Sequence, residues 1–238
     1  KRGDTWGTGF VLSRSGRSPT EPQLITGYGT QTARPALEVG DSECIRRGGA
    51  SVATVEYVAI VGLQLSARTR TTGNSAGISF VGKGAHLTFE GNLIEAFKDN
   101  LIFQRYLAPS LTNITIRRNV IVDSWSSVAH SQGIYADGVD GLQIEENVFD
   151  HNGWNESIAG AQKTIFNHNM YLQPTNTNVI VRRNVVARGS ATGIQLRGAG
   201  LADNNFVIEN SIGISLGHGQ APVPNTLDIE AINNVIYD

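Results

Sequence analysis

The chain has 238 residues with 19 basic and 21 acidic side chains, and its net charge of −2 offers no basic surface for wrapping nucleic acid. No apolar run approaches the ~18 residues that a membrane-spanning helix needs. Twenty-seven glycines and a single methionine, with many Asn, Thr, Val and Ile, favour short strands and tight turns over helices. The only cysteine, Cys44, excludes an internal disulfide and is best interpreted as a small buried apolar residue.

Residues 1–50 carry the weakest pattern in the chain. Short apolar pieces alternate there with Gly, Pro and Ser, which predicts irregular N-terminal turns of a stacked structure. The sequence opens on Lys1 without a targeting signal and stops at Asp238 directly after a predicted strand. We therefore expect the chain to be a fragment of a longer product.

From residue 51 onward one repeated unit dominates the sequence. Each copy has two apolar residues separated by one other residue. Two further residues follow, and then comes a fixed position that is usually asparagine. The fixed positions lie between 21 residues (184 to 205) and 37 residues (147 to 184) apart: Leu63, Asn92, Asn119, Asn147, Asn184, Asn205 and Asn234. A period of this size with strand-type alternation is typical of a β-solenoid. We expect the asparagines to form a stacked amide ladder at a sharp corner, where Asn tolerates a left-handed backbone.

A second set of strands lies between the asparagines, and several of its members begin with Gly-Ile. With Asn147-Val-Phe, Asn184-Val-Val, Gly133-Ile-Tyr and Gly193-Ile-Gln, residues 51–238 resemble the right-handed parallel β-helix proteins of the pectate-lyase-like fold. The resemblance implies an all-β, single-stranded parallel β-helix of about seven rungs. Proteins of this fold include polysaccharide lyases, glycoside hydrolases, uronate epimerases and phage tailspikes, so the fold alone does not define the chemistry.

Strand alternation predicts which side chains of the second set face outward. The inward positions are taken as Ile78, Ile102, Ile134, Met170, Ile194 and Ile214, which also turns Phe103 outward. In the middle rungs the neighbouring positions then form one polar strip, with Gln132 and His168 at its corner. The strip contains Arg105, Gln132, Tyr135, Asp137, His168, Tyr171, Gln173 and Arg197, and Gln195 is a further outward-facing position.

Two insertions, at residues 122–131 and 150–167, enter the same corner in adjacent rungs. They carry chemically versatile side chains, namely Asp123, Trp125, His130, Asp150, His151, Trp154 and Lys163, and His218 follows in a later rung. Insertions in a solenoid become loops on one face, often the binding face. We therefore predict a functional cleft where the two loops meet the polar strip.

Aromatic rings, amides and arginines together suit an acidic polysaccharide as substrate and partner. We predict a lyase or a C5 epimerase, in which Arg105 or Arg197 neutralises a uronate carboxylate. His168 or His130 then removes the α-proton, and Tyr135 or Tyr171 supplies a proton. The remaining predicted substrate-binding residues are Gln132, Gln173, Gln195, His151 and Trp154.

The sequence leaves three alternatives open. Glycoside hydrolysis needs two carboxylates, and Asp137 could pair with Asp99, Asp140 or Asp150. Calcium could bind Asp137 and Asp140, although the sequence requires no cofactor and defines no metal site. A non-catalytic carbohydrate-binding or structural solenoid, such as a trimeric phage tail fibre or a surface adhesin, is the third. All of these functions predict an extracellular location or a cell or virion surface.

Overall fold

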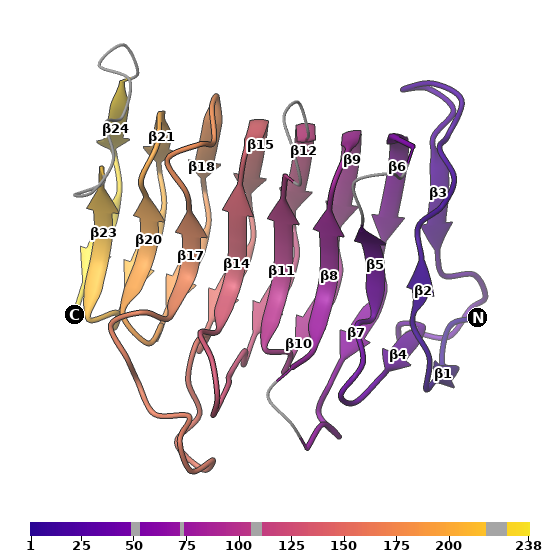
Figure 1. The fold of residues 1–238 in the computed structure, drawn as a ribbon, viewed down its shortest axis with the longest axis horizontal. Coiled ribbons are helices and arrows are strands. Elements are labelled where there is room, and N and C mark those ends of the chain that lie inside the picture. Colours follow the sequence, from indigo (N-terminus) through magenta and orange to yellow (C-terminus); the bar gives the residue numbers. More distant parts are fainter. Residues whose placement is uncertain (49–52, 72–73, 106–110, 218–227) are drawn as a thin grey trace.

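The computed structural model describes residues 1–48, 53–71, 74–105, 111–217 and 228–238. Successive strands enter three parallel sheets in turn, so that each strand pairs with the strands three before and three after it. Figure 1 shows the resulting rungs side by side, from the N-terminal end to the C-terminal end. This arrangement is a parallel β-helix and confirms the predicted all-β fold class. Within the described ranges, no helix is long and apolar enough to cross a membrane.

The three sheets are named here in the order in which the chain enters them. The first sheet contains β1 (Thr5–Trp6), β4 (Ala36–Glu38), β7 (Gln64–Ser66), β10 (Leu93–Glu95), β13 (Val120–Val122), β16 (Val148–Asp150), β19 (Val185–Ala187), β22 (Phe206–Ile208) and β25 (Val235–Tyr237). The second sheet contains β2 (Phe10–Val11), β5 (Ile45–Gly48), β8 (Ala76–Val81), β11 (Asp99–Gln104), β14 (Gln132–Asp137), β17 (His168–Leu172), β20 (Thr192–Leu196) and β23 (Ile212–Leu216). The third sheet contains β3 (Gln23–Thr26), β6 (Val55–Val61), β9 (Gly84–Glu90), β12 (Leu111–Arg117), β15 (Val139–Glu145), β18 (Val179–Arg182), β21 (Gly200–Asp203) and β24 (Ile229–Ile232).

The sheets hold nine, eight and eight strands, slightly more than the rungs expected from the repeat. The difference arises at the N-terminal end, where β3, β4 and β5 pair in register with the regular rungs and β1 and β2 pair with β4 and β5. Thr5 pairs with Ala36, for example, and Ile45 pairs with Ile78. Weakly patterned residues therefore still stack, because the neighbouring rung supplies the hydrogen-bond partners that their backbone needs.

The predicted asparagine ladder is confirmed. The side-chain amide of each ladder asparagine donates to the side-chain oxygen of the next, over 2.9 to 3.0 Å, along the series Asn92, Asn119, Asn147, Asn184, Asn205 and Asn234. The series begins where the Leu63 backbone N–H donates to the Asn92 side chain. These amides are largely buried, so the ladder satisfies polar groups that would otherwise be costly inside the solenoid.

The left-handed backbone at this corner belongs to a different residue from the one expected. The residue before each ladder position has a φ between 53° and 72°, and the set is Gly62, Gly91, Arg118, Glu146, Arg183, Asn204 and Asn233. The asparagine itself does not carry the positive φ. Its side chain instead turns into the core and continues the ladder from rung to rung.

A second buried amide ladder, which the sequence did not predict, supports the corner between the first and second sheets. The side-chain amide of Asn100 donates to Asn152, that of Asn152 to Asn169, and that of Asn169 to Asn210, over 2.9 to 3.0 Å. Asn152 lies near the start of the longer insertion and Asn169 lies just after its end, so this ladder fixes both ends of that loop against the rungs.

The register of β11 differs by one residue from the prediction. Leu101, not Ile102, pairs with Ile78 and Ile134, and both Leu101 and Phe103 are fully buried. The Phe103 ring lies 5.2 Å from the Phe89 ring in the core, centroid to centroid. Burial of the large Phe103 ring stabilises this register more than burial of Ile102 in place of Leu101 would stabilise the other. The residues of β11 that face outward are therefore shifted by one position from those predicted.

Candidate functional site

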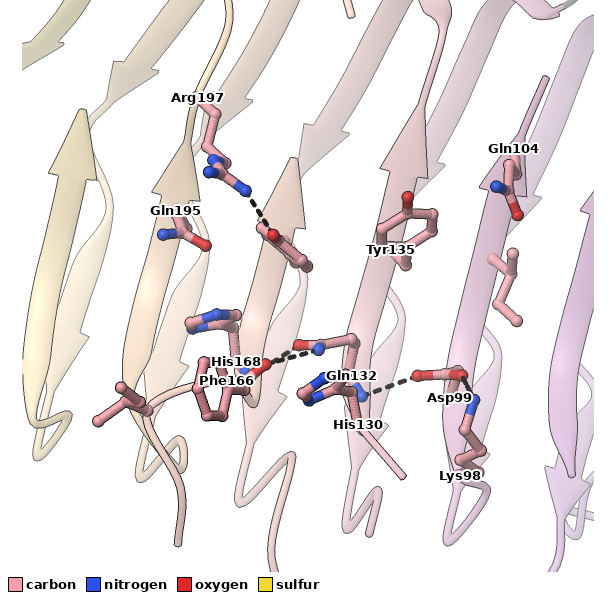
Figure 2. Close-up of a pocket in the computed structure, with 13 residues that line it drawn as sticks. Lys98, Asp99, Gln104, His130, Gln132, Tyr135, Phe166, His168, Gln195 and Arg197 are labelled. Carbon is pink, nitrogen blue, oxygen red and sulfur yellow. Dashed lines mark hydrogen bonds and ion pairs between the residues drawn. The ribbon is translucent and has the colours of Figure 1, made fainter. Parts of the chain in front are cut away.

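A cleft of about 730 Å³ lies over the outward face of β11, β14, β17 and β20. The two inserted loops border it at the start of these strands. This first cleft is lined by Lys98, Asp99, Ile102, Gln104, His130, Gln132, Tyr135, Ile165, Phe166, His168, Tyr171, Gln195 and Arg197. Figure 2 shows these side chains on one face of the sheet, from Lys98 at one end to Arg197 at the other.

One row of the first cleft follows the strand starts, where the loops enter the sheet. Asp99, Gln132 and His168 occupy successive rungs in register. The Gln132 backbone N–H donates to Asp99 Oδ1 (2.9 Å), and the His168 N–H donates to Gln132 Oε1 (2.7 Å). Each side chain therefore satisfies the backbone of the next rung, which fixes its orientation and confirms that Gln132 and His168 lie at a corner.

His168 is held as a neutral imidazole. Its side chain is almost completely buried, and its Nδ1 accepts the Thr192 backbone N–H at 3.3 Å. Burial lowers the pKa of His168 to about 4, with help from the positive charges of Arg197 and His130. Because Nδ1 accepts, the proton of the neutral ring is on Nε2. His168 therefore acts as a hydrogen-bond donor, which does not suit the role of base.

This depressed pKa predicts a pH-dependent stability. The unfolded chain protonates below the ordinary value of 6.5 and the folded chain only below about 4, so stability is complete above pH 6.5 and falls as the pH drops between these values. We expect His168 to account for a loss of about 3 kcal/mol over that range. Urea unfolding of the wild type and of His168→Gln at several pH values measures it. Parallel pH profiles for the two proteins would contradict the prediction.

The opposite row of the first cleft is aromatic and ends at an arginine. Tyr135 and Tyr171 pair in register, with ring centroids 5.7 Å apart, and the His168 ring lies 5.0 Å from that of Tyr171. Arg197 Nη1 donates to the Tyr171 hydroxyl and, at 3.4 Å, to Gln173 Oε1. Burial raises the pKa of the Tyr135 hydroxyl, so this phenol stays protonated at neutral pH. The row therefore offers a protonated phenol beside a phenol–guanidinium pair.

The other end of the first cleft carries an ion pair that the sequence analysis missed. Lys98 Nζ lies 2.6 Å from Asp99 Oδ2, and both groups line the cleft. Burial raises the pKa of the Asp99 carboxyl, while the Lys98 charge opposes that shift. The signal for this register was present, because Asn100-Leu101 matches Asn169-Met170, an asparagine followed by an inward apolar residue.

Most of the predicted site residues gather in the first cleft. His130, Gln132, Tyr135, His168, Tyr171, Gln195 and Arg197 line it. Gln173 adjoins it through Arg197. His130 is exposed at the rim, where its ring meets the Phe166 ring at 5.3 Å.

Arg105 and Asp137 do not line the first cleft, which corrects their predicted places. The shifted register of β11 puts Gln104 opposite Asp137, so Arg105 falls just beyond the strand. Arg105 Nε lies 4.0 Å from Asp137 Oδ1, and that carboxylate also accepts the Thr175 hydroxyl. The arginine and the carboxylate therefore contact each other at the edge of the strip.

His151 and Trp154 belong to a different surface, which is the second correction. His151 directly follows β16, so its side chain projects on the first-sheet side of the insertion and lines a separate cleft with Asp123. The Trp154 ring packs on His151 at 4.5 Å, and its Nε1 donates to the Arg188 carbonyl at 2.8 Å. The long loop thus divides the predicted single site into two. His218 lies outside the described residues.

Asp137 and Asp140, the two carboxylates considered for calcium, form hydrogen bonds with different partners. Asp140 accepts the Thr177 hydroxyl at 2.7 Å and the Asn178 amide at 2.6 Å, away from the contacts of Asp137. Across the described residues, no group of three or more His, Cys, Asp or Glu side chains has the arrangement to hold a metal ion.

Comparison with known proteins identifies the family of the fold. A family model described as the right handed beta helix region matches residues 68–236. No curated protein and no solved structure matches the chain.

Proposed function

This chain belongs to the right-handed β-helix family, and on that premise we propose that its first cleft binds an acidic polysaccharide and removes the C5 proton of a uronate residue. The activity is that of a lyase or a C5 epimerase. Acting on such a polymer would locate the protein outside the cell or on a cell or virion surface.

The observation that carries the proposal is the contact between Arg197 and the Tyr171 hydroxyl inside the cleft. The positive charge of Arg197 offsets the negative charge of a paired uronate carboxylate and stabilises the further negative charge that develops on it, which makes the neighbouring C5 proton easier to remove. The same carboxylate then lies beside a phenol that can exchange a proton with the sugar. Lys98 adds a second cation at the far end of the cleft for a neighbouring uronate.

The exposure of His130 and the tautomer of His168 decide which histidine is proposed as the base. His130, exposed on the rim, is assigned the role of base, since His168 presents Nε2–H as a donor. In a lyase reaction the base takes the C5 proton, the C5–H electrons form the C4–C5 double bond, and the C4–O bond breaks. Tyr171 then protonates the leaving oxygen, and Tyr135 is the adjacent protonated phenol. In an epimerase reaction a proton returns to the opposite face of C5 instead.

Hydrolysis is the weaker alternative, because glycosidases of the common type need two carboxylates about the scissile bond. Among the described residues that line the first cleft, Asp99 supplies the only carboxylate, and Lys98 contacts it directly. Asp150, another predicted partner, forms an ion pair with Arg188 in the first sheet.

Incubation with uronate polymers in D₂O tests the proposal. A lyase produces the ultraviolet absorbance of the unsaturated product, whereas an epimerase gives no absorbance but incorporates deuterium at C5. New reducing ends without either signal would identify a hydrolase and overturn the proposal. Binding with none of these signals would indicate a non-catalytic solenoid and overturn it as well.

A further inference from the structure

A second cleft, of about 600 Å³, lies beyond the C-terminal ends of the first-sheet strands β7, β10, β13 and β16, beside the two inserted loops. It is built by the rung corners on one side and the longer insertion on the other. Arg68, Arg70, Asp123, Trp125, His151 and Glu156 supply its chemistry. None of these residues lines the first cleft.

Four ionised groups of the second cleft, those of Arg68, Asp123, His151 and Glu156, form ion pairs with one another or with Glu95. Arg68 Nη2 lies 2.6 Å from Glu95 Oε2 and 3.6 Å from Asp123 Oδ2. His151 bridges the two loops, with Nδ1 at 2.9 Å from Asp123 and Nε2 at 3.1 Å from Glu156. The hydrogen bond that the His151 ring donates to Asp123 raises the pKa of His151, so the bridge favours the charged ring. These positive and negative groups offset each other, and the remaining cation, Arg70, is buried and held by carbonyl groups. The exposed surface therefore does not select a charged ligand.

The paired carboxylates can still receive hydroxyl groups. Asp123 and Glu156 have side chains that are 37% and 64% exposed, and an ionised carboxylate has roughly four lone-pair sites, of which His151 uses one on each. Hydroxyl groups of a ligand can therefore donate to the carboxylate oxygens of Asp123 and Glu156. The hydrogen bonds with His151 already hold these two side chains in place. Asn155 and Ser157 add neutral polar groups to the same wall.

A rigid aromatic ring completes the second cleft. The Arg70 guanidinium carbon lies 3.6 Å from the centroid of the Trp125 ring, and Arg70 also donates to the carbonyl groups of Trp125 and Ala96. Burial lowers the pKa of Arg70 to about 10, which leaves it charged at neutral pH. The Trp125 backbone N–H is held by the Phe97 carbonyl at 3.1 Å. A ring immobilised in this way binds the C–H face of a sugar with little loss of side-chain entropy.

We propose that the second cleft is a separate binding site for a neutral polysaccharide segment, a chain of hexose or pentose residues without carboxylates. The face of the Trp125 ring that Arg70 does not cover contacts the apolar face of a sugar ring, and Asp123 and Glu156 accept the hydroxyl groups of that sugar. The first cleft offers a sugar different groups. Among the described residues that line it, Asp99 is the only carboxylate and Lys98 contacts it directly, whereas Asp123 and Glu156 are exposed in the second cleft. The inference does not depend on the function proposed for the first cleft.

Isothermal titration calorimetry of the whole chain with mannohexaose, cellohexaose, xylohexaose and hexagalacturonate tests the inference. We expect at least one neutral hexaose to bind, and Trp125→Ala to weaken its affinity about tenfold or more. Glu156→Gln, a change in an exposed side chain, should weaken the same affinity without disturbing the fold. Trp6→Ala, in the exposed strand β1, is the matched tryptophan control and should have no effect.

Two results would overturn the inference. One is that no neutral hexaose binds with a Kd below about 10 mM. The other is that Arg197→Gln removes the neutral-sugar binding while Trp125→Ala and Glu156→Gln leave it intact, which would place the sugar in the first cleft. Uronate turnover is measured separately, so failure of either proposal is recognised on its own.

Discussion

Tyr171→Phe is expected to lower the turnover of a uronate polymer by about 10²- to 10⁴-fold, the range typical of a lost proton-transfer group. The change removes one oxygen, which is both the acceptor of the Arg197 hydrogen bond and the proposed proton donor. The ring packing against Tyr135 and His168 is retained, so the fold and the shape of the cleft should persist. The initial rate of unsaturated-product formation measures the effect, or C5 deuterium incorporation in the case of an epimerase.

Tyr28→Phe is the matched control, because Tyr28 is an exposed tyrosine near the N-terminus, remote from the cleft. It should retain the wild-type rate. A KM change without a change in kcat for Tyr171→Phe would reassign the residue to substrate binding. Equal rates for Tyr171→Phe and Tyr28→Phe would contradict the mechanism.

Asn147→Ala is expected to reduce the free energy of unfolding by about 4 kcal/mol, since each buried polar group left unsatisfied costs roughly 1–3 kcal/mol. The Asn147 side chain accepts from the backbone and side chain of Asn119 and donates to Asn184 and to the Ile116 carbonyl. Alanine removes all of these bonds from the middle of the ladder and also leaves a cavity. Chemical denaturation followed by circular dichroism measures the loss.

Asn74→Ala is the control for the ladder, because Asn74 is an exposed asparagine outside it. That substitution should change stability by less than about 0.5 kcal/mol. If Asn147→Ala is no more destabilising than Asn74→Ala, the ladder does not stabilise the stack in the way described here.

The fold could be predicted because its signal is repeated. A single strand would not define a register, but the asparagine returns at Asn92, Asn119 and Asn147 in the same position relative to two apolar residues. Each copy constrains the others, since a shift in one rung would break the amide bonds to both neighbours. The hydrogen bonds of the ladder follow the predicted positions for this reason.

The site was less predictable because it depends on features that occur once. In β11 two aliphatic residues stand side by side, and the choice between Leu101 and Ile102 decides whether Asp99 or Asn100 reaches the cleft. The burial of Phe103 and the match of Asn100-Leu101 to Asn169-Met170 both settle that choice, but each occurs only once in the sequence. The path of the long insertion is likewise set by its own contacts, and His151 therefore lies on the far side of the loop from His168.

The most direct test of the central claim is a crystal structure of the Tyr171→Phe protein with a bound oligouronate. We predict that the sugar chain crosses β14, β17 and β20 in the first cleft, with one carboxylate on Arg197 and a ring beside Tyr135. An oligouronate bound in the second cleft or on the third sheet, with the first cleft empty, would contradict the claim.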